Sequence, residues 1–154
     1  MAKRRKSNRA FWAFMLFVYS LVMLWLLFGR ENGWEEGLPY REQIRSNINL
    51  TPFLTIKNYY YTLIGSSSGE MVRHCFINLA GNVLLFIPAG YLLPRLWRRQ
   101  RKFFLFLFTC AGLILLVEAV QLVTLLGSFD VDDVILNLSG MTLGYLLCII
   151  SRPR

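Results

Sequence analysis

The sequence has few of the side chains that most often carry enzymatic or metal chemistry. Among 154 residues it has one histidine, His74, and three cysteines, Cys75, Cys110 and Cys148. No two cysteines lie at the spacing of a metal-ligand motif, and the single histidine belongs to no cluster. The chain also has no H-E-x-x-H helix, no glycine-rich phosphate loop and no nucleophile motif. Acidic and amide side chains are therefore the main candidates for a functional site.

Charged residues are scarce and apolar residues are abundant. Hydrophobic residues make up 55% of the chain and charged residues 17%, with a mean hydropathy of +0.45. This composition is more apolar than that of a soluble domain. Four apolar stretches approach the roughly 20 residues that cross a bilayer as a helix: 10–28, 74–93, 103–126 and 133–150. The sequence predicts an all-α membrane protein, in which residues 1–154 form a single four-transmembrane-helix bundle.

Basic and acidic residues are separated along the chain. Twelve of the 17 basic residues, Arg152 and Arg154 among them, lie at the termini or between the second and third stretches, where there is no acid. Because basic segments stay on the cytoplasmic side, we expect both termini in the cytoplasm of a multi-pass cell-membrane protein. One long external loop, 29–73, then joins the first two helices. Basic clusters beside membrane spans suit anionic lipid headgroups, so we expect membrane lipid, and no nucleic acid, as a partner.

Polar residues recur at helical spacing inside the second, third and fourth stretches. Charge within or beside lipid is costly and usually has a functional reason. In the predicted topology these groups fall in the outer half of the bundle, where three helices can bring them to one depth. The candidate residues of this polar pocket are Asn78, Asn82, Glu118, Gln121, Asp130, Asp132, Asp133 and Asn137.

Several of these residues have a structural interpretation as well. Asn78 and Asn82 can hydrogen-bond to neighbouring helices. Glu118 can pair with Arg73 or accept a hydrogen bond from either asparagine. In the fourth stretch, the small-xxx-small pattern of Gly140-Met141-Thr142-Leu143-Gly144 favours close helix packing.

Asp130, Asp132 and Asp133 form a dense acidic turn before the fourth stretch. Their carboxylates are the hard oxygen ligands that Ca²⁺ and Mg²⁺ prefer, although no EF-hand pattern follows them. They are weak candidates for a divalent-cation site, and we expect no resident cofactor. The alternative is that Asp130 or Asp132 caps the helix that begins there.

Four patches of the sequence carry a family resemblance. They are Asn49-Leu50-Thr51-Pro52-Phe53, the Asn-Leu-x-Gly-Asn…Phe-x-Pro-x-Gly string over 78–90, Glu118-Ala119-Val120-Gln121, and Phe-Asp-x-Asp-Asp…Asn over 129–137 with Gly140 beyond. In their order and spacing the chain resembles VanZ-like membrane proteins, a family named for a teicoplanin-resistance accessory protein. Many members carry an arginine just before the Phe-Asp pair, where this chain has Gly127-Ser128.

The resemblance implies a small bacterial envelope protein, and some such proteins lower susceptibility to lipoglycopeptide antibiotics without modifying peptidoglycan. Our first hypothesis is non-enzymatic: the outer polar pocket binds a membrane lipid, a lipoglycopeptide or a lipid-linked envelope precursor. A second hypothesis is an intramembrane enzyme acting on a lipid-linked substrate through Glu118 and the 130–133 acids. A third is a structural or helper subunit in which the polar groups only hold helices together.

Overall fold

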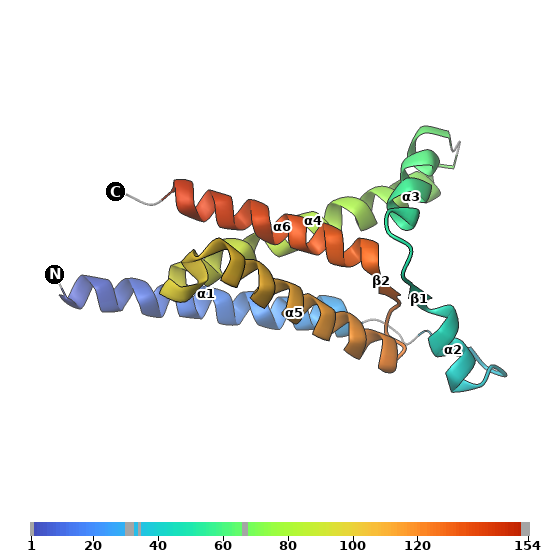
Figure 1. Ribbon diagram of the computed structural model, residues 1–154, viewed down its shortest axis with the longest axis horizontal. Helices are drawn as coiled ribbons and strands as arrows, with labels where there is room; N and C mark the ends of the chain where they lie inside the picture. Colours follow the sequence, from blue (N-terminus) through green and yellow to red (C-terminus); the bar gives the residue numbers. More distant parts are fainter. Residues whose placement is uncertain (1, 30–32, 34, 66–67, 152–154) are drawn as a thin grey trace.

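The computed structural model describes residues 2–29, 33, 35–65 and 68–151, and most of them are helical (Figure 1). Within these ranges, four helices have the length and composition to cross a membrane. They are α1 (Ala2–Phe28), α4 (Gly69–Leu96), α5 (Phe103–Val123) and α6 (Val131–Ile150). The expectation of an all-α protein with four helices suited to cross a membrane is confirmed.

All but one of the shorter elements in the described ranges gather at one end of the four-helix bundle, the exception being the 3-10 helix η1 (Arg98–Arg101) between α4 and α5. α2 (Tyr40–Ser46), β1 (Ile48–Asn49) and α3 (Leu54–Gly65) lie between α1 and α4, and β2 (Phe129–Asp130) precedes α6. The two strands pair in parallel. In Figure 1 these elements lie on the right, whereas the start of α1, the end of α6 and the α4–α5 connection lie on the left. The long segment expected as a loop, 29–73, is thus largely folded.

The helix bounds differ from the expected spans where a polar segment precedes an apolar stretch or a turn interrupts its end. α4 begins at Gly69, before the expected 74–93, because its polar first turns continue the helix beyond the apolar stretch. α5 ends at Val123, inside the expected 103–126, because Leu125 adopts a left-handed backbone with φ 55°. Arg152 and Arg154, which contributed to the expected orientation, lie outside the described residues.

α4 and α6 make the most extensive contact between any two elements within the described ranges. A Cβ atom at Gly140 or Gly144 of α6 would overlap the backbone of α4, and one at Gly90 of α4 would overlap the backbone of α6. Small residues let helix backbones approach closely where water cannot drive association. The packing role expected for Gly140 and Gly144 is therefore confirmed.

All four long helices contribute to the buried core, although α1 contributes least. Of the α1 side chains that the structure describes, Met23 alone is buried. Large apolar side chains such as Phe14, Trp25 and Phe108 point outward and are more than half exposed, as expected for lipid-facing helices. The core cluster comprises Met23, Phe86, Ala89, Phe106, Cys110, Ile114, Met141 and Tyr145.

The glycine contact can be tested with two matched substitutions. Both Gly140→Ala and Gly81→Ala replace a helix-interior glycine, which favours the helix by about 1 kcal/mol. Nothing lies within 4 Å of a Cβ at Gly81, whereas a Cβ at Gly140 meets the Val83 carbonyl. We expect Gly140→Ala to destabilise the folded bundle by about 1–3 kcal/mol through overpacking, and Gly81→Ala to leave it unchanged or more stable. Thermal unfolding in detergent measures both, and equal melting temperatures would contradict this packing.

Candidate functional site

Polar side chains from three long helices meet at the level where α6 begins. Asn82 of α4 donates a hydrogen bond from Nδ2 to Oδ1 of Asp133 on α6. Glu118 of α5 is 5% exposed and lies beside the Asp130 backbone and close to the Asp130 and Asp133 carboxylates. Three of the residues expected to converge are therefore in direct or near contact.

Asn137 lies one helical turn after Asp133 on the same face of α6. Its side chain is 4% exposed, and its buried Oδ1 has no hydrogen-bond partner in the part of the chain that the structure describes. Burying a hydrogen-bond acceptor without a donor lowers the stability of the fold by about 1–3 kcal/mol, a cost that an apolar residue at the same position would avoid. We refer to Asn82, Glu118, Asp133 and Asn137 as the acid–amide cluster.

Tyr59 of α3 also lies beside this cluster. Burial, followed by the negative charges of Asp133, Cys75 and Asp130, raises the pKa of its hydroxyl above the usual value. Its ring packs edge-on against His74, with the ring centres 6.2 Å apart. No pattern in the sequence groups this residue with the cluster, because its position depends on α3 folding back onto α4.

Asp132 holds the start of α3 rather than facing the cluster. The side chain is fully buried. Its Oδ1 accepts a hydrogen bond from the Phe53 backbone N–H, and its Oδ2 accepts one from the Ile56 backbone N–H at 3.0 Å. The first N–H groups of a helix lack partners within the helix. The Asp132 carboxylate, which belongs to α6, therefore caps the start of α3.

Asp130 makes a second set of contacts to the same segment. Its Oδ1 accepts from the Asp132 backbone N–H at 2.8 Å, so Asp130 is the N-cap of α6, as one of the two alternatives proposed. Its Oδ2 accepts from Thr55 Oγ1 at 2.6 Å and from Asn49 Nδ2 at 3.2 Å. We call Asp130 and Asp132 together the loop clamp, because they fix residues 49–56 to the start of α6.

The three carboxylates of the acidic turn face different partners, and the cation site suggested there stays an untested prediction. Within the described ranges, no group of three or more His, Cys, Asp or Glu residues is arranged to hold a metal ion. Asp130 and Asp132 face the 49–56 segment, while Asp133 faces Asn82 on α4. Successive side chains on a helix point in different directions, so the three neighbouring carboxylates diverge instead of converging on one ion.

Two further candidates, Gln121 and Asn78, make no contact with the acid–amide cluster among the described contacts, and the expected ion pair between Glu118 and Arg73 is absent from them. Gln121 donates from Nε2 to the Leu27 carbonyl at 2.9 Å and so ties α5 to the end of α1. Asn78 is half-buried, and within the described ranges its side chain makes no hydrogen bond. The Arg73 side chain is exposed, whereas Glu118 is buried beside the Asp130 backbone.

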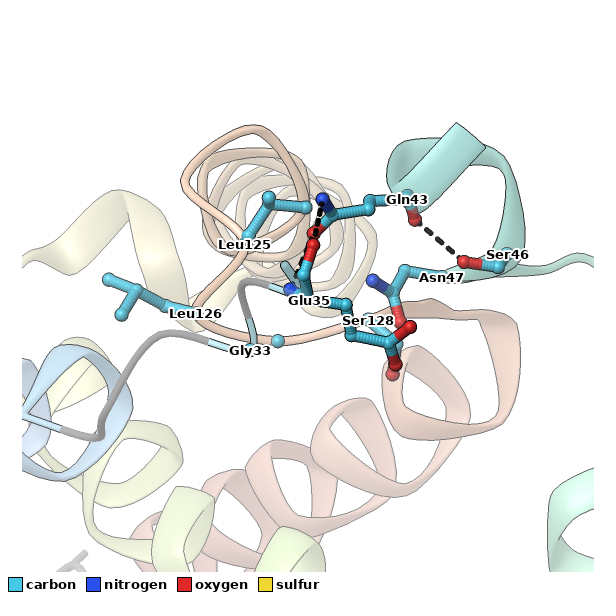
Figure 2. Close-up of a pocket in the computed structure, with 9 residues that line it drawn as sticks. Gly33, Glu35, Gln43, Ser46, Asn47, Leu125, Leu126 and Ser128 are labelled. Atoms are coloured by element: carbon cyan, nitrogen blue, oxygen red, sulfur yellow. Dashed lines mark hydrogen bonds between the residues drawn. The ribbon is translucent and has the colours of Figure 1, made fainter. Parts of the chain in front are cut away.

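A separate polar pocket of about 330 Å³ lies between the segment that precedes α2 and the turn after α5 (Figure 2). Buried Gln43 shapes it: its Nε2 donates to the carbonyls of Glu35 and Leu38, and its Oε1 accepts from the Glu35 N–H. Gly127 and Ser128, which stand where many VanZ-like proteins have arginine, line this pocket. None of the eight candidate residues does.

The fold and this polar interior define a helical membrane protein with acidic groups gathered at one level. A family model described as VanZ/LLP1 matches residues 12–152, nearly the whole chain. The chain therefore belongs to the VanZ-like family, and the resemblance seen in its four patches is confirmed. No curated protein and no solved structure matches it.

The loop clamp predicts that Asp132 is structural. Asp132→Ala removes the acceptors of two backbone N–H groups, so we expect the α3 segment to loosen at a cost of about 1–3 kcal/mol. Limited proteolysis should then cut the 35–65 segment faster while α5 and α6 stay protected. Glu36→Ala, which changes an exposed acid in the same segment, is the matched control. Equal cleavage rates in the two variants would contradict the clamp.

Proposed function

We propose that this protein is a bacterial cell-membrane protein that lowers susceptibility to teicoplanin-type lipoglycopeptides by non-enzymatic binding at the outer leaflet. The binding group is the acid–amide cluster, and the ligand is the polar part of a lipid-anchored envelope molecule or of the lipoglycopeptide itself. The observation that carries the proposal is the meeting of Asn82, Glu118 and Asp133 from three membrane helices.

The chemistry of the cluster favours a ligand that is rich in hydrogen-bond donors. Glu118 and Asn137 present buried oxygen acceptors, and the Asn137 Oδ1 has no partner among the residues described. Helix packing alone does not call for a buried acceptor without a donor, because an apolar residue of similar shape would avoid the cost. Hydroxyl and N–H groups of a saccharide or peptide headgroup would supply the missing donors.

The exposed surface of α3 supports a site at the membrane interface. Tyr60, Tyr61 and Ile64 are each more than half exposed, and the Lys57 ammonium lies 5.9 Å from the centre of the Tyr61 ring. Aromatic and basic residues together are enriched at lipid headgroups. A lipid-anchored ligand would therefore contact α3 while its polar part reaches the cluster beside Tyr59.

Antibiotic susceptibility tests the proposal directly. A bacterial host expressing the wild-type protein should show a higher inhibitory concentration for teicoplanin than the host alone, and little change for a glycopeptide without a lipid tail. Asp133→Asn and Glu118→Gln should abolish this protection, because each removes an acceptor charge from the cluster. Glu70→Gln, at an exposed acid in the first turn of α4, should keep it.

Protein abundance and melting temperature are measured on the same strains. Full protection by the Asp133→Asn and Glu118→Gln variants at normal abundance would overturn the binding proposal. A fall in melting temperature that precedes any loss of protection would instead favour the helper-subunit hypothesis.

An enzymatic role is the second candidate, favoured by the closeness of the Asp133 carboxylate to the Glu118 carboxylate and to the Tyr59 hydroxyl. Such a set can transfer protons at a bound substrate. Lipid extracts from the same strains separate the two functions. An envelope lipid that is modified only when the wild-type protein is present would favour the enzyme.

The proposal places the cluster outside the cell and both termini in the cytoplasm, following the basic residues. A fluorescent protein fused after Arg154 should therefore fold and fluoresce. Alkaline phosphatase inserted between Gly65 and Gly69, where the chain passes from α3 to α4, should be active, because this enzyme needs the oxidising periplasm. The reverse pattern of activities would place the cluster on the cytoplasmic side.

A further inference from the structure

An open apolar groove of about 650 Å³ lies toward the basic end of the bundle, far along α4 and α6 from the acid–amide cluster. Trp12 and Met15 of α1 form one wall, and Ile87 and Tyr91 of α4 form the other. The volume lies within the roughly 300–1,000 Å³ of small-ligand sites. It exists because α1 packs loosely: its described side chains bury Met23 alone.

Arg95 stands beside the groove, one helical turn after Tyr91. Its Nη2 donates to the Tyr91 hydroxyl at 2.6 Å and to Ser151 Oγ at 2.8 Å. The guanidinium lies over the rings of Trp12 and Tyr91, 4.9 and 4.7 Å from their centres. These contacts hold the cation against two residues that line the groove.

The Arg95 guanidinium has no acidic partner among the residues that the structure describes. No ion pair is recorded between Arg95 and an acid in the ranges described, and its Nε is buried with no hydrogen-bond partner there. The residues that follow add further positive charge, at Arg98, Arg99 and Arg101. A buried donor on a cation with no acidic neighbour calls for an anion from outside the chain.

We propose that this groove binds one anionic phospholipid. An acyl chain lies between Met15 and Ile87, and the phosphate pairs with the partly exposed guanidinium of Arg95. Basic pockets between transmembrane helices recognise such headgroups, and Arg binds phosphate through its fixed set of donors. A second copy of the chain is a less suitable occupant of the groove, because the segment from Arg95 to Lys102 contains no Asp or Glu that could pair with Arg95.

This site is independent of the proposed function, since it lies at the other end of the helices. Its consequence is structural: the lipid would fill the space between α1 and α4 that protein side chains leave open. α1 would then be held to the bundle partly by its lipid, so its position would respond to the anionic lipid content of the membrane.

Native mass spectrometry of the full-length protein in detergent tests the proposal with two lipids of identical acyl chains, phosphatidylglycerol and phosphatidylcholine. We expect the wild type to retain one phosphatidylglycerol in preference to phosphatidylcholine. Arg95→Gln should lower phosphatidylglycerol binding about tenfold, the effect of losing one charge-assisted hydrogen bond. Arg99→Gln, an exposed residue of the same basic segment that does not line the groove, should retain the preference.

Equal retention of the two lipids by the wild type, or an unchanged preference in Arg95→Gln, would overturn the proposal. A loss as large in Arg99→Gln would also overturn it, because general surface charge would then explain binding. If Arg95→Gln fails to fold, Met15→Trp and Ala13→Trp decide. The first fills the groove and should prevent retention of either lipid, whereas the second adds the same side chain on an exposed face of α1 and should not.

Discussion

The close approach of α4 and α6 is the contact on which the rest of the structure depends. Gly140 and Gly144 let the α6 backbone meet α4, and Gly90 does the same from α4. At this separation the short side chain of Asn82 reaches the carboxylate of Asp133. A bulkier residue at any of the three glycines would push the helices apart and break this hydrogen bond between two partly buried polar side chains, a cost that lipid cannot relieve with water.

The acidic turn before α6 performs two separate tasks because its carboxylates point in different directions. Asp130 and Asp132 bind the backbone and side chains of residues 49–56, whereas Asp133 faces the helix interior. The N–H groups at the start of α3 need acceptors, and Asp132 supplies them from another helix. One short turn therefore starts α6, anchors the segment between α1 and α4, and completes the acid–amide cluster. Because Tyr59 of α3 lies close to Asp133, a ligand bound at the cluster would also contact α3.

The parts of the fold that follow from periodicity could be predicted from the sequence. The four helices follow from the length of the apolar stretches, and the packing face follows from the helical spacing of Gly140 and Gly144. The grouping of Glu118 with Asp133 follows from the antiparallel order of the predicted spans. The loop clamp could not be predicted this way. It joins Asn49 to Asp130 across 81 residues through a parallel strand pair that leaves no periodic pattern. Gln121 shares a turn with Glu118, yet it bonds to α1, because helical spacing fixes a face but not the neighbour that the face meets.

The two unusual polar sites lie at opposite ends of the same helices, and this separation explains why the chain does not neutralise them itself. α6 has 20 residues and so is about 30 Å long, which keeps Asp133 at its start far from Arg95, whose partner Ser151 follows its end. Charges this far apart contribute almost nothing to each other's stability across the bundle. Each must be satisfied locally: Asp133 accepts a hydrogen bond from Asn82, and Arg95 donates to two hydroxyls and lies over two aromatic rings. Among the described residues, Asn137 Oδ1 lacks a hydrogen-bond donor at one end of the bundle, and Arg95 Nε and Gln100 Oε1 lack partners at the other end. The acceptor of Asn137 and the donor of Arg95 therefore have opposite requirements, and each of our two proposals supplies one of them.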